Sequence, residues 1–352
     1  MKHISTVKNV SLINLSDRGV ICSIKKNPEK KIISDGDGIY LINDKNIQEI
    51  VNEKITVFKP FNKGILYNTM PEMETQLKFY DFNKIITLTE DPYYFDPLSN
   101  RYSGGILLSN FDKEGKEHYY FMDYEFNIKE LPDFYQIKIK DKYIQYSKKG
   151  SIKAFQDKTF SIVWQTDIRQ FGKYIFRDRK TGEILAERDN EIQHAPLAYN
   201  NLLIVPLIGG QLVALDIETG EKVWMYEGER IFGRYELYEN RIYRNSGNSI
   251  QEISVDNGKL IKDKKFKDDP LISNYNATGE FLVNRNVIVL KDSPAKIVVL
   301  NRETFEVMDY IKMDARLGSL KNNLVWHNNH LYVLDISNNL YIFEKEENNI
   351  QT

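Results

Sequence analysis

The chain has 352 residues, 41% of them hydrophobic and 28% charged, a composition typical of a globular protein with enough apolar surface to close a core. Its 48 basic and 50 acidic side chains leave a net charge of −2, which argues against a nucleic-acid partner and against an anionic membrane surface. The single cysteine, Cys22, excludes an internal disulfide bond.

The first twenty residues show no export signal. Lys2, Lys8, Asp17 and Arg18 interrupt this segment, so it lacks the apolar stretch of a secretory signal. No segment of the chain approaches the roughly 20 apolar residues needed to cross a bilayer. We therefore expect a cytoplasmic protein without a membrane partner.

Strand and hairpin signals recur through the first half of the chain. Thr6–Leu15 (TVKNVSLINL) has the composition of a strand, and Lys173–Asp189 has that of an extra hairpin, either an insertion or a shrunken repeat. Between them lie four segments in which two strand-like runs flank a turn: YLINDKNIQEI from Tyr40, KFYDFNKIITL from Lys78, YYFMDYEFNIKEL from Tyr119 and IKAFQDKTFSIVW from Ile152.

The second half carries a clearer repeat. In Asn201–Gly228, Gly209-Gly210 supplies one hairpin turn and Gly220 the left-handed position of a second, so three strands form a meander. Related units begin at Arg241, Lys296 and His330. If Asp216, Asp256, Asn301 and Glu344 are equivalent turn positions, the spacings are 40, 45 and 43 residues.

A period of 40 to 50 residues with four short strands is the pattern of a propeller blade. The sequence therefore predicts an all-β fold, a single β-propeller of seven or eight four-stranded blades that spans residues 1–352. We expect the N-terminal strand to complete the C-terminal blade, because closure removes two exposed sheet edges. The extra hairpin or insertion is placed near residues 169–195.

One segment carries a family resemblance. Residues 214–224, ALDIETGEKVW, read as A-x-D-x-x-T-G-x-x-x-W, and Ala154, Thr159 and Trp164 repeat part of this pattern. The pattern resembles the repeat of PQQ-like (quinoprotein-type) β-propellers. The resemblance implies that each tryptophan docks on a neighbouring blade and that the turn residues fix its approach. The signature residues are Ala214, Asp216, Thr219, Gly220, Trp224 and Trp164.

Candidate chemical sites all have a structural explanation. His327 and His330 flank a turn and lack a third metal ligand, and Asp35-Gly36-Asp37-Gly38 has Asn46 where a calcium loop needs glutamate. His194 and His118 have no nucleophile motif beside them. We predict no catalytic, cofactor-binding or metal-binding residues, and the chain is not expected to be an enzyme.

The loops are more informative. B–C loops and D–A links of successive blades lie on one face of a propeller, and the longest of them here are Asn68–Gln76, Asp91–Tyr102, Asn110–Glu117 and Arg169–Ala195. Tyrosine and methionine are enriched in interface cores, and proline-stiffened loops lose little entropy on binding. The predicted partner-binding residues are Met70, Met73, Tyr93, Tyr94, Phe95 and Tyr102. The alternative is that these rings pack back onto the disc as local core.

Together these features favour a non-catalytic, protein-binding propeller. The most specific hypothesis is an immunity protein that binds and neutralises a bacterial toxin. Two alternatives are a ligand-binding or enzymatic propeller that uses its central channel, and a structural adaptor in a larger assembly. Fold analogy does not choose among them.

Overall fold

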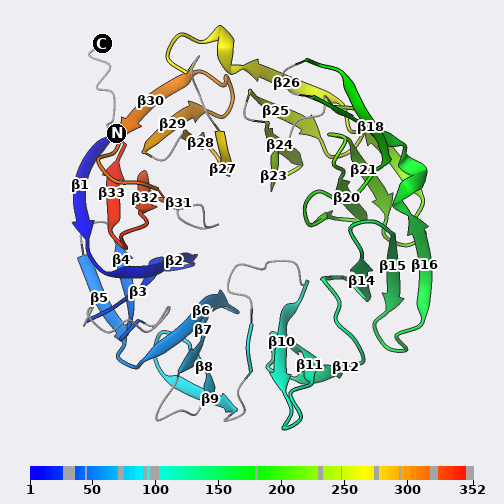
Figure 1. Ribbon diagram of the computed structural model, residues 1–352. Coiled ribbons are helices and arrows are strands. Elements are labelled where there is room, and N and C mark those ends of the chain that lie inside the picture. The colour runs from blue at the N-terminus through cyan, green and yellow to red at the C-terminus, as the bar shows by residue number, and fades with distance from the viewer. Residues whose placement is uncertain are drawn as a thin grey trace.

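The computed structural model describes residues 1–26, 36–43, 46–69, 75–89, 93–95, 103–178, 181–228, 233–246, 248–272, 277–292, 295–317 and 324–345. Their strands form eight sheets around a ring, with one further two-stranded hairpin (Figure 1). The fold is thus an eight-bladed β-propeller, which confirms the predicted class and resolves the choice between seven and eight blades. The helices of the described residues are two 3₁₀ turns, η1 (Ile168–Phe171) and η2 (Phe266–Asp268).

Most blades have four antiparallel strands, A to D from the centre outward. Blade 1 comprises β2 (Val10–Ser16), β3 (Gly19–Ile24), β4 (Ile39–Asn43) and β5 (Asn46–Val51), and blade 2 comprises β6 (Ile55–Phe61), β7 (Gly64–Thr69), β8 (Gln76–Tyr80) and β9 (Ile85–Thr89). Blade 4 comprises β13 (Ile137–Ile139), β14 (Lys142–Tyr146), β15 (Ser151–Gln156) and β16 (Ile162–Asp167), and blade 5 comprises β19 (Leu197–Tyr199), β20 (Leu202–Pro206), β21 (Leu212–Asp216) and β22 (Lys222–Tyr226). Blade 6 comprises β23 (Arg234–Tyr238), β24 (Arg241–Asn245), β25 (Ser249–Ser254) and β26 (Leu260–Lys265), and blade 7 comprises β27 (Ala277–Val283), β28 (Val287–Asp292), β29 (Lys296–Asn301) and β30 (Val307–Lys312).

In blade 3 the described residues form three regular strands. It comprises β10 (Gly105–Phe111), β11 (Glu117–Asp123) and β12 (Ile128–Leu131). At its inner position, an antiparallel bridge joins Tyr94 to Ser109. Residues 93–95, which were predicted as part of a loop, therefore lie at the inner position of blade 3.

The ring closes as predicted, but with different strand bounds. Blade 8 comprises β31 (Leu324–His327), β32 (His330–Leu334) and β33 (Leu340–Glu344), and β1 (Lys2–Val7) pairs antiparallel with β33 as its outermost strand. The predicted strand Thr6–Leu15 was wrong as a single element. Asn9 adopts a left-handed conformation with φ of 63°, which separates β1 from β2 of blade 1.

The surplus residues before blade 5 form the predicted extra hairpin. β17 (Lys173–Arg177) pairs with β18 (Ile184–Asp189), and together they make a two-stranded sheet outside the blades. In Figure 1 this hairpin extends from η1 along the outside of the ring.

The turns between C and D strands explain the repeat signature. Oδ1 of Asp216 accepts hydrogen bonds from the backbone N–H of Glu218 (2.8 Å) and Thr219 (2.9 Å), and Gly220 takes the left-handed position with φ of 73°. The amide of Gly220 closes the turn onto the carbonyl of Asp216. In blade 6 the same bond joins Gly258 to Ser254, so Ser254, and not the predicted Asp256, is the equivalent of Asp216.

The core lies between blades, where apolar faces of neighbouring B and C strands meet. The seam between blades 4 and 5 is representative: its fully buried members include Ile144, Ile152, Leu203, Val213 and Leu215. Burying a side chain of this size contributes about 1.5–3 kcal/mol, so blade packing is the main source of stability.

Two of these seams are finished by tryptophan, as the family resemblance implies. Nε1 of Trp164 donates to the carbonyl of Ile217 in the next blade (2.7 Å), and Nε1 of Trp224 donates to that of Val255 (2.8 Å). The Trp164 ring covers Gly220, where an added Cβ would lie 2.5 Å from ring atoms. Each indole therefore packs on the left-handed glycine of the following blade.

Two other seams use lysine in the place of tryptophan. In the strand register Lys262 opposes Glu252 as Trp224 opposes Ala214, and Phe305 occupies the left-handed turn position that glycine holds elsewhere. The ammonium of Lys262 lies 4.8 Å from the centre of the Phe305 ring and donates to the carbonyl of Glu303. This pair exchanges an indole over glycine for a cation over an aromatic ring.

The seam between blades 3 and 4 repeats the lysine arrangement. Nζ of Lys129 lies 4.5 Å from the centre of the Phe160 ring and donates to the carbonyl of Asp157 (2.7 Å). That carbonyl is equivalent to the one that Trp164 reaches in blade 5. The two kinds of seam therefore make the same contact between blades. In one kind the outer strand supplies the aromatic ring, and in the other the turn of the next blade supplies it.

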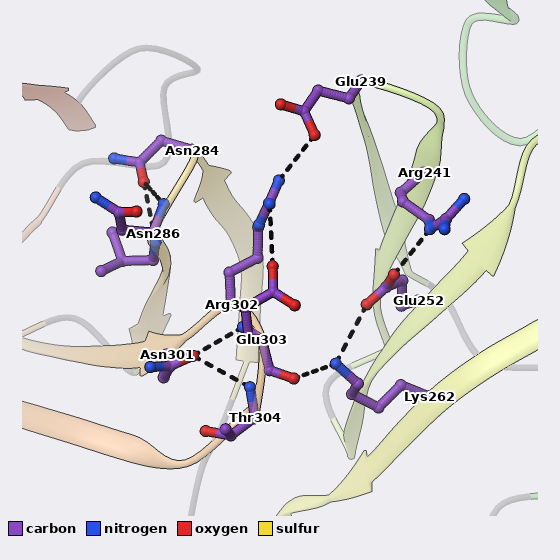
Figure 2. Close-up of polar contacts among 11 residues, drawn as sticks. Glu239, Arg241, Glu252, Lys262, Asn284, Asn286, Asn301, Arg302, Glu303 and Thr304 are labelled. Atoms are coloured by element: carbon purple, nitrogen blue, oxygen red, sulfur yellow. Dashed lines mark hydrogen bonds and ion pairs between the residues drawn. The ribbon is translucent and has the colours of Figure 1, made fainter.

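Further ion pairs surround the Lys262 seam (Figure 2). Nη1 of Arg302 lies 3.3 Å from Oε2 of Glu239 in blade 6, and its Nη2 lies 3.1 Å from Oε1 of Glu303. Nε of Arg241 donates to Oε1 of Glu252 (3.0 Å), whose other oxygen lies 3.6 Å from Nζ of Lys262. The Arg302–Glu239 pair joins blade 7 to blade 6, whereas the other pairs lie within one blade and place each charge beside its counter-charge.

Candidate protein-binding face

The B–C loops and D–A links lie on one face of the ring, which we call the loop face. On blade 3 it includes the end of β10, the start of β11 and the link after β12. Tyr94 belongs to it as well, because its bridge partner Ser109 is near the end of β10.

The described residues of the predicted aromatic loop lie in two different environments. Tyr93 and Phe95 are 9% and 8% exposed and belong to the core between blades 2 and 3, where the Tyr93 ring meets that of Tyr120 edge-on at 5.1 Å. For these two residues the alternative of local core packing is the one observed. Tyr94 between them is 48% exposed. Met70, Met73 and Tyr102 lie outside the described residues.

Tyr94 is one of four neighbouring rings on the loop face of blade 3. Its ring lies 6.2 Å from that of Phe111 in an edge-on arrangement, and the Tyr119 ring lies 5.1 Å from that of Phe134. Ser109 pairs with both Tyr94 and Tyr119, so the two pairs of rings occupy neighbouring strands. We call Tyr94, Phe111, Tyr119 and Phe134 the blade 3 aromatic surface.

Three of these rings are unusually exposed for their size. Phe111 is 52% exposed, Tyr94 48% and Phe134 37%. Clustered exposed aromatic side chains mark interaction sites, whereas scattered single ones are ordinary. The arrangement is therefore suited to contact with another macromolecule.

Carboxylates border the same surface. Glu117 opposes Phe111 in the register of β10 and β11, and its Oε2 accepts a hydrogen bond from the hydroxyl of Tyr119 (2.7 Å). Asp133, next to Phe134, accepts from Nε2 of Gln145 in blade 4 (3.0 Å). Both carboxylates are exposed.

A histidine lies between two acids on the same blade. Nε2 of His118 lies 3.0 Å from Oδ2 of Asp112, and its Nδ1 lies 3.4 Å from Oε1 of Glu130. The hydrogen bond to Asp112 raises the pKa of His118, with a smaller contribution from Glu130 that opposes partial desolvation. The hydrogen bond to His118 also lowers the pKa of Asp112.

We expect Asp112→Asn to lower the pKa of His118 toward the ordinary histidine value of about 6.5, because it removes the main charge that holds the imidazolium. Titration of the His118 ring protons by NMR measures this directly. Since the folded-state pKa is raised, the stabilisation is complete below about pH 6.5 and is lost as pH rises through the folded value. An unchanged midpoint in Asp112→Asn would show that the carboxylate does not govern the ring.

The β17–β18 hairpin is a second exposed element. It lies in the link between blades 4 and 5 and is therefore connected to the blades on the loop face. Ile175 and Phe176 on β17 are 41% and 40% exposed, and Ile184 and Leu185 on β18 are 59% and 55% exposed. The guanidinium of Arg188 lies 5.8 Å from the centre of the Phe176 ring. The hairpin therefore adds apolar surface beyond that of the blades.

The remaining chemical candidates have local partners. Nδ1 of His330 contacts the carbonyl of Asn328 (2.8 Å), His194 contacts the carbonyl of Gly233 (2.7 Å), and Asp37 accepts from the amide of Lys26 (2.6 Å). Asp35 lies outside the described residues. Within the described ranges, no three histidine, cysteine or acidic side chains are grouped to hold a metal, and no helix is long and apolar enough to cross a membrane.

Phe111, Tyr119 and Phe134 were not predicted as partner-binding residues. A hairpin register built on the Asp112–Lys116 turn would have paired Phe111 with Glu117 and Ser109 with Tyr119. That register was available in the sequence. The position of Phe134 beside Tyr119 depends on the path of the link to blade 4, which no pattern indicates.

Comparisons with known proteins agree with this fold. The model of a PQQ-like family, described as outer membrane protein assembly factor BamB, matches residues 148–352, which is more than half of the chain. No sequence among curated proteins matches.

Solved structures supply further similarities. The computationally designed protein Ika8 is 9% identical with a TM-score of 0.58, over 98% of this chain and 100% of the other. Sqt1 of Saccharomyces cerevisiae is 8% identical with a TM-score of 0.56, over 98% and 99%. BamB of Moraxella catarrhalis is 14% identical with a TM-score of 0.43, over 98% of each chain. At these identities, the first two similarities show the fold alone.

Proposed function

Because the chain belongs to the PQQ-like family described as outer membrane protein assembly factor BamB, we propose that it is a non-catalytic propeller that binds a protein. The observation that carries this proposal is the blade 3 aromatic surface, where Tyr94, Phe111 and Phe134 expose neighbouring rings on the loop face. Aromatic anchors of this kind dominate the binding energy of protein interfaces.

The finer proposal is an immunity protein that binds a toxin and neutralises it in the cytoplasm. A blade with exposed rings on a rigid sheet offers a preformed contact surface, which suits a dedicated inhibitor because little entropy is lost on binding. The adaptor alternative would use the same surface in a longer-lived assembly. Binding of a small molecule in the central channel would depend on the inner strands of the blades and not on Phe111 or Phe134, which lie on β10 and in the link after β12.

The double substitution Tyr94→Ser and Phe111→Ser should weaken partner binding by about 30-fold or more, the loss expected for an interface hot spot of about 2 kcal/mol. To measure this, the polypeptides encoded beside the gene are passed over the immobilised protein. Each polypeptide that is captured is then titrated against the wild type and the variants. Tyr124→Ser is the matched control, since Tyr124 is equally exposed at 48% but lies in the C–D turn of the same blade.

Two outcomes would contradict the proposal. Equal capture by the double variant and the control would remove the aromatic surface as the site. The immunity function would be contradicted if loss of the gene left cells as resistant as before to every toxin encoded nearby. Thermal unfolding of each variant separates lost binding from lost folding.

A further inference from the structure

The part of blade 3 that carries the aromatic surface has more acidic than basic side chains. Residues 103–135, which contain β10, β11, β12 and their turns, include seven acidic side chains and three lysines, a formal charge of −4 when histidine is neutral. The whole chain carries only −2. One of the three lysines is paired outside this group: Nζ of Lys129 lies 3.1 Å from Oδ1 of Asp157 at the seam between blades 3 and 4.

Two of these acids border the exposed rings. Glu117 lies opposite Phe111 in the strand register and accepts from the Tyr119 hydroxyl, and Asp133 directly precedes Phe134. Each carboxylate already accepts a neutral donor and remains exposed, so each keeps its charge available to a partner. Rings and carboxylates thus occupy one side of the blade.

The same two carboxylates act on the Tyr119 hydroxyl. The hydrogen bond to Glu117, partial burial, and the charges of Glu117 and Asp133 together raise the pKa of Tyr119 to about 12. A negative environment disfavours the phenolate, and the same environment favours a cation placed beside the ring.

We propose that the blade 3 aromatic surface binds a basic segment of the partner protein, with an arginine or lysine seated against its rings and paired with Glu117 and Asp133. This inference rests on the proposed protein-binding function and names the chemistry of the partner. Aromatic faces attract guanidinium and ammonium groups, and the carboxylates add charge complementarity at the rim. Arginine is the better occupant because its planar group can stack on a ring while pairing with a carboxylate.

The first test uses three synthetic peptides with one sequence, acetyl-Gly-Xaa-Gly-Xaa-Gly-amide, in which Xaa is arginine, citrulline or glutamate. Citrulline keeps the shape of arginine without its charge. The arginine peptide should shift the amide NMR signals of β10 and β11 with an affinity on the order of millimolar, and added salt should weaken it. Equal shifts with the citrulline peptide, or none with the arginine peptide, would overturn the proposal.

The second test neutralises the carboxylates without removing their acceptor atoms. Glu117→Gln with Asp133→Asn should weaken the arginine peptide, and any partner captured through Tyr94 and Phe111, by about tenfold. The control, Asp17→Asn with Glu221→Gln, removes two exposed charges from turns of blades 1 and 5 and should leave binding unchanged.

The two proposals can fail separately. If a captured protein depends on Tyr94 and Phe111 but binds the neutralised variant as tightly as the wild type, protein binding stands and the basic partner is wrong. If capture does not depend on the rings at all, the proposed site itself is wrong.

Discussion

Gly220→Ala is expected to destabilise the propeller by about 2–5 kcal/mol. Gly220 has φ of 73°, a region that costs an L-residue about 1–2 kcal/mol, and the added Cβ would lie 2.5 Å from Cδ2 and Cε3 of Trp164. Overpacking of this kind costs about 1–3 kcal/mol more, because the indole is also held by its hydrogen bond to the Ile217 carbonyl. Urea unfolding of wild type and variant measures the difference.

A matched glycine separates the two contributions. Gly115 has φ of 80°, and a Cβ there meets nothing within 4 Å, so Gly115→Ala should cost only the conformational term of about 1–2 kcal/mol. In a Trp164→Leu background the steric part of the Gly220→Ala cost should shrink. Equal costs at both glycines, or no change in the leucine background, would show that the indole does not pack on Gly220 as described.

The signature that identified the fold also predicted this seam. Asp216, Thr219, Gly220 and Trp224 each serve the turn or the blade contact that the resemblance implies, since the residues act locally or on the adjacent repeat. Blade number was harder, because the repeat of blade 3 has no signature. A blade whose contacts are made by residues other than those of the signature cannot be identified by searching for the signature.

The loop face was predicted only in part. Period-two alternation places Tyr93 and Phe95 in the core and Tyr94 outside, but the flanking prolines favoured a loop interpretation over a short strand. Among the described residues of this segment, Tyr94 pairs with Ser109. The direction of the side chains in this segment is set by its pairing with β10, and the local sequence does not predict that pairing.

The lysine seams were also outside the predictions, although the sequence has Phe160 where the signature of the next repeat has Gly220. The structure gives that replacement a partner at two seams, where the preceding blade supplies Lys129 over Phe160 and Lys262 over Phe305. Phe126, at the left-handed position of the same turn in blade 3, packs instead on Phe61 and Phe79 of blade 2. Where the turn carries Gly220 or Gly258, the preceding blade supplies tryptophan. At these seams the covering residue therefore differs with the residue at the turn of the next repeat.

This dependence predicts a compensating pair of substitutions. Phe305 is 1% exposed, so Phe305→Gly alone should cost about 3–5 kcal/mol, less about 1 kcal/mol from relief of its left-handed backbone. Lys262→Trp alone should cost about 1–3 kcal/mol, because the indole would meet the Phe305 ring that the ammonium now covers.

Combined, Lys262→Trp and Phe305→Gly should rebuild the arrangement seen at Trp224 and Gly258 and recover at least about 2 kcal/mol relative to the sum of the single costs. Urea unfolding of the four proteins in this cycle gives the coupling energy. A matched cycle that pairs Lys262→Trp with Gly258→Ala, at the turn of its own blade, should show no such recovery, since Gly258 packs under Trp224 instead. Additive costs in the first cycle would mean that tryptophan over glycine and lysine over phenylalanine are not interchangeable solutions of one contact, and that each blade interface is set by its wider surroundings.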